Sequence, residues 1–318
     1  MQSGEDSGCG FPNRTPSAWH LAEALGPDLV TLRKRDNTIM PATLNHPKWP
    51  ALLDSLRGMG AVTVAVSGGV DSLLLATLAH RSLPGRTLMA HAVSPAVPPE
   101  CTARVRTEAQ AQGWRLTLVD SGEFSDERYL QNPYDRCYFC KQHLYSSLGV
   151  LSRELSDWFK TTPIIVSGTN TNDLGEHRPG LDAAREHGAR HPFVEAGIAK
   201  GDIRAMAGEL GLWFAQIPAS PCLSSRIYTG TRVTPEILAA VNFAETFLRD
   251  RLNVSVVRCR IRNRDMLVEM QEKQRALADA QTLAELDRHL KAQFPAVDGV
   301  ALDPESYRAG RAFTRQTP

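Results

Sequence analysis

Cysteine is scarce in this chain, which has six in 318 residues. That is too few for a disulfide scaffold, so we expect a reduced, cytoplasmic protein. Long hydrophobic runs are also missing, since none approaches the roughly 20 apolar residues that a membrane span requires. The N-terminal sequence MQSGEDSGCGFPNRTPS has neither the basic start nor the apolar stretch of a secretory signal. We therefore expect no association with a membrane.

An excess of charge of one sign is absent as well. The chain has 36 Lys and Arg residues against 35 Asp and Glu residues, for a net charge of +1. No strong field is available to attract nucleic acid, so we expect none as a partner. The hydrophobic content of 42% and charged content of 22% are ordinary for a soluble globular protein, and 318 residues allow two domains.

One short stretch carries the clearest functional signal: residues 61–72 read AVTVAVSGGVDS. Its apolar start predicts a buried strand, and the leucine-rich residues 73–79 predict a helix, with two glycines in the turn between them. Such a turn is a natural anion site, because glycines allow close approach while free N–H groups and the helix dipole favour negative charge. The stretch lacks the lysine of a Walker A loop and the third glycine of a dinucleotide fingerprint.

This stretch resembles the SGGxDS signature of the PP-loop ATP pyrophosphatases, which use ATP to adenylate an oxygen of a substrate and release pyrophosphate. The resemblance implies that ATP and Mg²⁺ bind at the loop residues Ser67, Gly68, Gly69, Asp71 and Ser72. Asp71 is interpreted either as a metal ligand or as a residue that structures the loop. An aspartate that only caps its helix, in an ordinary glycine turn, is the structural alternative.

Strands and helices alternate along the next part of the chain. Strands are expected at residues 62–66, 87–93, 115–119 and 164–167, and helices at 47–57, 73–82, 100–112, 141–158, 183–187 and 200–210. The alternation predicts an α/β fold, with a mainly parallel sheet covered by helices on both faces. Ligands of such sheets bind at the carboxyl ends of the strands, so we expect residues 168–173 to lie beside the glycine turn.

The pattern changes after residue 221. Thr234 and Pro235 predict the start of a helix that runs to about Asp250. Residues 254–261 alternate like a half-buried strand, which residues 266–270 can pair with, and residues 276–290 predict another helix. We therefore divide the chain into a loosely ordered extension (1–45), a PP-loop domain (46–230) and a smaller α+β domain for substrate binding or oligomerisation (231–318).

Three cysteines invite a chemical interpretation. Cys137 and Cys140 form a C-x-x-C pair, and Cys222 lies in the turn-rich stretch SPCLSSR. Alone, the pair fits a redox site, half of a zinc site or chance, and no further cysteine pair or histidine pair completes a zinc set. Three cysteines can instead hold an iron–sulfur cluster with one open iron, which suits sulfur transfer. Alternatively, Cys222 is itself a nucleophile whose pKa is lowered by Arg226.

Four segments sharpen this interpretation: NPYDRCYFCK, GTNTNDLGEHRPGLDAA, PFVEAGIAKGDIR and PASPCLSSRI. Together they resemble the LarE family, the ATP-dependent sulfur transferases of nickel-pincer nucleotide biosynthesis. The similarity runs from about residue 61 to 227 and continues more weakly beyond. Members adenylate a carboxylate of a pyridinium dicarboxylate mononucleotide and convert it to a thiocarboxylate, forming AMP and pyrophosphate.

The LarE family has two sources of sulfur. One version sacrifices a single cysteine and leaves dehydroalanine, while the other uses three cysteines to hold a [4Fe-4S] cluster that carries an extra sulfide. The resemblance implies the three-cysteine type here, with the cluster on Cys137, Cys140 and Cys222, and with Cys222 and Asp71 as catalytic residues. It also implies a sulfide source, the other enzymes of the pathway and a homo-oligomer as partners.

The phosphate of such a nucleotide substrate needs a cationic seat. Arg226, Arg258 and Arg260 are the candidates, and the last two are expected to face the same side of a strand because they are two residues apart. A solvated basic surface is the alternative. Glu176 and Arg178 match the family motif and are expected to line the site, or else to serve in capping and a salt bridge.

Three other functions stay open. A PP-loop tRNA thiolase can combine the same loop with three cysteines, but its substrate demands a basic surface. An ATP-dependent amidase or synthetase related to GMP or NAD synthesis would use ammonia and would have no need of the cysteines. A nucleotide-sensing or scaffold protein would keep the fold without the reaction.

Overall fold

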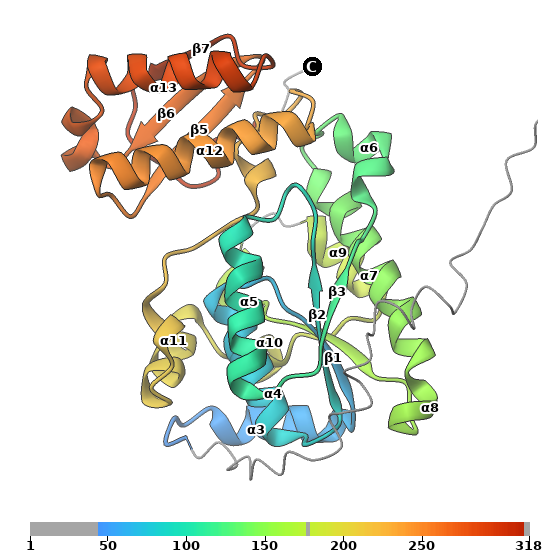
Figure 1. Ribbon diagram of the computed structural model, residues 1–318. Helices are drawn as coiled ribbons and strands as arrows, with labels where there is room; N and C mark the ends of the chain where they lie inside the picture. The colour runs from blue at the N-terminus through green and yellow to red at the C-terminus, as the bar shows by residue number, and fades with distance from the viewer. Residues whose placement is uncertain (1–43, 176–178, 315–318) are drawn as a thin grey trace, which may run out of the picture. The chain divides into compact units, whose positions relative to one another are not determined.

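A parallel sheet organises the first part of the described chain, as the computed structural model shows (Figure 1). The model describes residues 44–175 and 179–314, which belong to one compact unit. The strand order is β3-β2-β1-β4, and all three neighbouring pairs are parallel. The strands are β1 (Val62–Ala65), β2 (Thr87–Ala92), β3 (Leu116–Val119) and β4 (Ile164–Ser167). The predicted α/β class is thereby confirmed.

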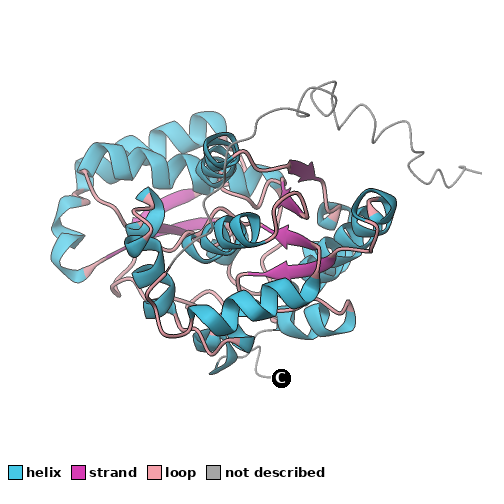
Figure 2. Ribbon diagram, turned by 90° about the horizontal axis from the view of Figure 1, so that it is seen from below, coloured by secondary structure: helices cyan, strands magenta, loops and turns pink. Residues whose placement is uncertain are grey.

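Helices connect these strands because parallel neighbours need long crossovers. The connecting helices include α4 (Val70–Ser82), α5 (Pro99–Gln112) and α7 (Arg136–Glu154). Val64 of β1 joins the hydrophobic cluster under α4, whereas the hydroxyl of its neighbour Thr63 lies 3.0 Å from that of Ser152 on α7. Helices therefore cover both faces of the sheet, as expected (Figure 2).

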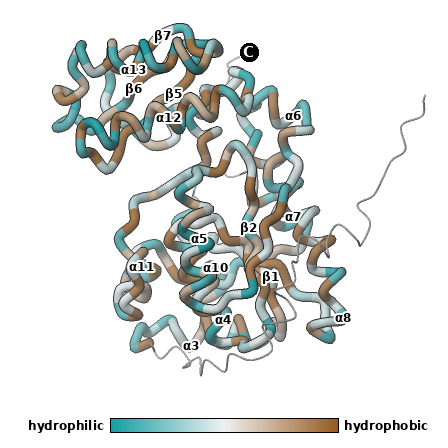
Figure 3. The backbone as a smooth tube through the Cα atoms, in the orientation of Figure 1, coloured by the Kyte–Doolittle hydropathy of each residue, from teal (hydrophilic) through white to brown (hydrophobic). Residues whose placement is uncertain are grey.

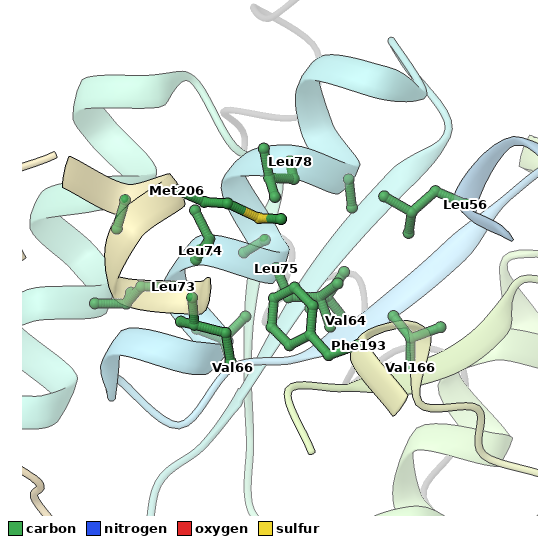
Figure 4. Close-up of a cluster of buried hydrophobic side chains, with 14 of the residues drawn as sticks. Leu56, Val64, Val66, Leu73, Leu74, Leu75, Leu78, Val166, Phe193 and Met206 are labelled. Atoms are coloured by element: carbon green, nitrogen blue, oxygen red, sulfur yellow. The ribbon is translucent and has the colours of Figure 1, made fainter. Parts of the chain in front are cut away.

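The core lies between β1, α4 and the helices α3 (Trp49–Met59) and α11 (Lys200–Glu209). Leu74, Leu75 and Leu78 of α4 are fully buried against Val64 and Phe193 (Figure 4). α4 is buried on nearly all sides, which explains why apolar residues are not confined to one face of the helix. Figure 3 shows the same concentration of hydrophobic residues on β1. This packing fixes the start of α4, where the glycine turn lies.

A second, smaller sheet follows, in the order β5-β6-β7. β5 (Val257–Arg262) and β6 (Asp265–Met270) are antiparallel, and β7 (Gly299–Leu302) lies parallel to β6. The helices α12 (Pro235–Leu252) and α13 (Ala280–Gln293) pack with this sheet. The predicted start of α12 is confirmed, because the Thr234 side chain accepts a hydrogen bond from the Ile237 N–H at 3.2 Å. The domain limits at residues 45 and 230 stay predictions.

Three sequence predictions were wrong in detail. The helix expected at 141–158 begins at Arg136 and ends at Glu154, since Leu155 separates it from the short α8 (Ser156–Phe159). Cys137 and Cys140 therefore lie inside its first turns, not before it. The strand expected at 254–261 begins only at Val257, and it is buried on both faces rather than half-buried, because loop and C-terminal segments cover its arginine-bearing side. β7 was not expected.

The remaining elements are short. They are α6 (Glu127–Leu130), α9 (Pro179–Glu186), α10 (Pro192–Glu195), η1 (Glu123–Ser125), η2 (Thr171–Gly175), η3 (Trp213–Gln216), η4 (Leu223–Arg226) and η5 (Glu272–Leu277). Among the described helices, none has the length and apolar composition that a membrane crossing needs. The extension expected at residues 1–45 falls outside the described residues except for its last two.

We expect the Leu75→Ala variant to lose about 2–5 kcal/mol of unfolding free energy, because a fully buried side chain leaves a cavity in this core. The matched control is Val150→Ala on α7, where the side chain is 46% exposed and the loss should stay below about 0.5 kcal/mol. Urea denaturation monitored by circular dichroism measures both. Equal losses would contradict the placement of α4 in the core.

Candidate active site

The glycine turn lies between the end of β1 and the start of α4, as the motif predicted. The Ser67 N–H donates to Ser72 Oγ at 3.0 Å, and that hydroxyl donates to the Gly69 carbonyl at 3.0 Å. The buried Ser72 hydroxyl therefore shapes the loop from inside. The first N–H groups of α4 have no acceptor within the helix and stay available for an anion.

Close packing requires glycine at two points of this edge. Gly68 has a φ of +81°, and a Cβ there would lie 2.6 Å from the Cys101 carbonyl oxygen. A Cβ on Gly168, which follows β4, would lie 2.9 Å from the backbone N of Ser72. The loop at 168–173 therefore lies directly against the glycine turn, which confirms that both loops share one edge of the sheet.

Asp71 connects these two loops. One carboxylate oxygen, Oδ2, accepts hydrogen bonds from Lys200 Nζ and, at 3.4 Å, from Asn170 Nδ2. Its other oxygen, Oδ1, is buried and has no hydrogen-bond partner among the described residues. Gly69 caps α4 and no side chain does, so the capping interpretation of Asp71 finds no support in the described contacts. The free lone pairs on Oδ1 suit a Mg²⁺ ion, whose preferred ligands are oxygen atoms.

The three cysteines come from two segments. Cys137 and Cys140 lie three residues apart in the first turns of α7, on one side of the helix, and are partly buried. Cys222 is exposed and directly precedes η4. Two contacts hold the η4 turn near α6 and α7: Arg136 Nη1 of α7 donates to the Ser224 carbonyl at 2.9 Å, and the hydroxyls of Tyr129 of α6 and Ser224 are 2.8 Å apart.

The three thiols influence one another's pKa. Burial raises the pKa of Cys137, which Arg136 opposes, and raises the pKa of Cys140 to about 12; a charge on Cys222 raises both further. Burial lowers the pKa of Lys141, but Tyr145 and the three cysteines together raise it above its usual value. Without a further positive charge, Cys137 and Cys140 are therefore neutral thiols at pH 7.

The described residues contain no group of three or more His, Cys, Asp or Glu side chains that could hold a metal ion. A four-iron cluster makes a different demand, because each of its ligating sulfurs binds a separate iron. The chemistry of the donor set, three thiols flanked by Arg136 and Lys141, fits such a cluster.

Arg226 is buried and fully engaged. It forms a bidentate ion pair with Glu245 of α12, with both N–O distances at 2.9 Å, and donates to the carbonyls of Pro221 and Cys222. Its guanidinium therefore holds the Cys222 turn in place. It contacts the Cys222 backbone directly, which keeps open a role near the thiol.

Arg258 and Arg260 face the same side of β5, as their spacing predicted. Arg258 donates to the Ala219 carbonyl at 3.2 Å and Arg260 to the Ser225 carbonyl at 3.1 Å. Both are buried, so the alternative of a solvated basic surface is wrong. Arg260 also pairs with the buried Glu269, at 2.8 Å. The two arginines thus attach β5 to the loop that carries Cys222.

A pocket of about 490 Å³ opens beside this loop, and four arginines line it. Arg226 and Arg258 are two of the predicted residues, whereas Arg260 does not line it. Sequence reasoning missed the other two, Arg104 of α5 and Arg249 of α12. Arg249 donates to Thr246 Oγ1 at 3.0 Å, but its ion pairs are long, 3.7 Å to Glu245 and 3.8 Å to Glu100, so its guanidinium is less committed than that of Arg226.

Similarity to known proteins decides the family. No family model matches the chain. An uncharacterised protein of Synechocystis sp. is 40% identical over 197 residues, 62% of this chain and 71% of its own length. The pyridinium-3,5-bisthiocarboxylic acid mononucleotide synthase of Lactiplantibacillus plantarum, a LarE protein, is 34% identical over 233 residues, 73% of this chain and 82% of its own. The chain belongs to the LarE family.

A further relative, an uncharacterised protein of Methanocaldococcus jannaschii, is 29% identical over 189 residues, 59% of this chain and 69% of its own. LarE membership places the chain among sulfurtransferase enzymes. It does not distinguish the two sulfur sources of the family, so the roles of the individual site residues stay predictions.

Not every predicted site residue of this LarE chain can be located. Glu176 and Arg178 lie outside the described residues. Conversely, Lys200, Arg136 and Lys141 lie at the site although sequence reasoning did not select them. All three stand inside the segments that carry the LarE resemblance, PFVEAGIAKGDIR and NPYDRCYFCK, which was the available signal.

We expect Gly168→Ala to weaken ATP binding, because the added Cβ must push the loop away from the backbone of Asp71 and Ser72. A clash of this kind in a packed structure costs about 1–3 kcal/mol. Gly175→Ala is the matched control, since no atom of the described residues lies within 4 Å of the Cβ it would add. Isothermal titration with Mg²⁺ and a non-hydrolysable ATP analogue measures both affinities. Unchanged affinity in Gly168→Ala would separate this edge from the nucleotide site.

Proposed function

We propose that this chain is an ATP-dependent sulfurtransferase acting on a pyridinium dicarboxylate mononucleotide. It adenylates one carboxylate, releases pyrophosphate and converts the carboxylate to a thiocarboxylate. The printed name of the Lactiplantibacillus plantarum relative, a pyridinium bisthiocarboxylate mononucleotide synthase, supports this substrate and product.

One chain of contacts carries the proposal, because it joins the ATP loop to the sulfur site. Gly68 packs against Cys101, and Arg104 Nη2 donates both to Cys101 Sγ at 2.9 Å and to Ser220 Oγ at 3.2 Å. Ser220 lies two residues before Cys222. The Leu223 N–H, directly after Cys222, donates to the Ala96 carbonyl in the loop after β2 at 2.8 Å. An intermediate activated at the ATP loop therefore forms close to the thiol-bearing turn.

The charges explain the division of labour. A carboxylate is a poor acyl donor because its leaving group would be oxide. An acyl adenylate is a good acyl donor because its leaving group is AMP. Bringing a carboxylate to ATP joins two anions, which the N–H groups at the start of α4 and a Mg²⁺ ion on Asp71 offset. Lys200, paired with Asp71, supplies a further cation at the same point.

Sulfur enters at the three-cysteine site. Cys137, Cys140 and Cys222 would hold a [4Fe-4S] cluster, which when bound supplies an iron position able to carry an exchangeable sulfide. Because their pKa values are raised, Cys137 and Cys140 keep their protons in the absence of a metal, and iron would bind in place of these protons. In the sacrificial version, the Cys222 thiolate attacks the acyl adenylate and expels AMP, and β-elimination then leaves thiocarboxylate and dehydroalanine.

The four-arginine pocket provides the seat for the substrate phosphate. Its lining includes Ala219 and Ser220, so a phosphate bound there would lie next to the loop that carries Cys222. Arg226 and Arg258 already serve the protein's own backbone and carboxylates. Arg249 and Arg104, whose Nε atom is buried without a partner among the described residues, have donors left for a ligand.

Anaerobic purification followed by turnover tests the function. We expect pyrophosphate release that depends on the pyridinium dicarboxylate mononucleotide, a thiocarboxylate product by mass spectrometry, and about four irons per chain. Cys137→Ala should lose the iron and multiple turnover, whereas Cys259→Ala, which alters a buried thiol of β5, should keep both.

Other results would redirect the proposal. Absence of iron together with loss of the mass of H₂S from Cys222 after turnover would establish the sacrificial version. Failure to release pyrophosphate with this substrate would remove the adenylation step. Co-purified tRNA that dissociates steeply with salt would instead support a tRNA thiolase.

The phosphate seat has its own test. We expect Arg249→Gln to raise the KM for the mononucleotide about 10- to 100-fold with little change in kcat, since a hydrogen bond to a charged group contributes about 1.5–3 kcal/mol. Arg251→Gln, two residues along the same helix, removes an exposed arginine that pairs with Glu285 at 3.5 Å and serves as control. Equal KM values in the two variants would place the phosphate elsewhere.

A further inference from the structure

Two cations flank the Cys137–Cys140 pair. Arg136 and Lys141 bracket Cys137 and Cys140 in the sequence RCYFCK at the start of α7. Lys141 lies four residues after Cys137, so the two side chains share a face of the helix. No acidic residue occupies the first turn of α7, whose dipole adds to the positive field.

Arg136 is 1% exposed, which makes it the largest fully buried side chain described. Nη1 donates to neutral acceptors, the side-chain oxygen of Asn132 and the Ser224 carbonyl, while Nη2 is buried without a hydrogen-bond partner among the described residues. The guanidinium lies over the ring of Phe313, 5.4 Å from its centre. A buried charge without a counter-ion is costly, so the site is built to receive negative charge.

The aliphatic part of the Lys141 side chain is packed against α9. A Cβ on Gly180 would lie 2.9 Å from Lys141 Cγ and 3.5 Å from the Cys137 carbonyl, so α9 packs tightly over this part of α7. The pKa of Lys141 is raised by Tyr145 and by Cys137, Cys140 and Cys222, against the effect of burial. Among the described residues, no carboxylate forms an ion pair with Lys141.

A carboxylate opposes this field. Glu123 of η1 is buried, accepts a hydrogen bond from Ser121 Oγ at 2.6 Å, and raises the pKa of Cys140. Among the charged side chains that act on the pKa of Cys137 and Cys140, the cations Arg136 and Lys141 outnumber it. We therefore expect a positive field at the thiols before any of them ionises, and removal of Glu123 should make it more positive.

We infer that Arg136 and Lys141 form an anion seat that captures the small sulfur anion, hydrosulfide, beside Cys137, Cys140 and Cys222. The inference rests on the proposed function for its sulfur chemistry and adds the residues that gather the donor. Hydrosulfide carries one negative charge and is small enough for a site formed between one helix face and one turn. Its capture involves no covalent step.

Alkylation of the metal-free protein tests the field directly. Iodoacetate is anionic and iodoacetamide is neutral, yet both react with the same thiolate, so the ratio of their rates at one cysteine is independent of how much thiolate is present. We expect Lys141→Gln to lower this ratio at Cys222 about three- to tenfold, as expected for loss of one charge near a partly exposed group. Peptide mass mapping assigns each alkylated cysteine.

Three matched variants complete the experiment. Glu123→Gln should raise the ratio, Lys141→Arg should keep it, and Lys291→Gln, on the exposed surface of α13, should leave it unchanged. A ratio unaffected by both Lys141→Gln and Glu123→Gln would overturn the seat. If Lys141→Gln does not fold, the Glu123→Gln result alone decides.

Anaerobic calorimetry identifies the anion. We expect sodium hydrosulfide to bind the unmodified chain and to lose at least tenfold in affinity in Lys141→Gln, while sodium acetate, a probe for the substrate carboxylate, does not bind at this site. Binding of acetate alone would overturn the assignment to sulfur. None of these measurements needs ATP, iron or the mononucleotide, so the seat can stand if the proposed reaction fails, and the reaction can stand if the seat fails.

Discussion

The buried ion pair between Arg226 and Glu245 is the interaction on which the arrangement of the site depends. Burying two charges is expensive, and the pair persists because its hydrogen bonds are saturated: Arg226 also binds two loop carbonyls, and Glu245 also accepts the Cys259 N–H at 3.1 Å. The ion pair thus joins α12 and β5, through Glu245, to the Cys222 turn, through Arg226. Such a pair adds little stability over an apolar contact, but it allows only one position for the turn. The exposed Cys222 thiol therefore lies on a turn whose position is fixed by a buried ion pair.

Close approach of backbones sets the opposite side of the site. Gly68 brings the glycine turn against α5, and Gly168 brings the loop after β4 against the start of α4. Since α5 also carries Arg104, which reaches Ser220, the two glycines and one arginine transmit the position of the sheet edge to the cysteine turn. The ATP loop and the sulfur site are therefore connected through backbone and hydrogen bonds rather than through a flexible linker.

Periodicity and turn chemistry predicted most of the first sheet, because β1 and α4 are apolar segments separated by an unambiguous glycine turn. They failed where tertiary contacts decide. β5 reads as a half-buried strand because Arg258 and Arg260 alternate with apolar residues, and the arginines are buried by the loop at 219–225 and by the C-terminal segment, which are distant in the sequence. β7 has just four residues, Gly299–Leu302, and its pairing with β6 leaves no signal in its own composition. The cysteines were found because cysteine is rare, whereas Arg136 and Lys141 are ordinary residue types, and only their place in the segment NPYDRCYFCK could have singled them out.

Burial and charge at the thiols act in opposite directions, and the balance suits a sulfur carrier. Burial keeps Cys137 and Cys140 protonated, so neither reacts spontaneously with an electrophile such as an acyl adenylate formed nearby. The flanking cations reduce the cost of ionisation once a metal or an anion-accepting group arrives. Cys222 differs because it is exposed on a turn, where it meets substrate first. The site thus holds two protected thiols, Cys137 and Cys140, beside the accessible thiol of Cys222. This difference in burial suits Cys137 and Cys140 to retaining a sulfur-carrying group and Cys222 to meeting the substrate that accepts the sulfur.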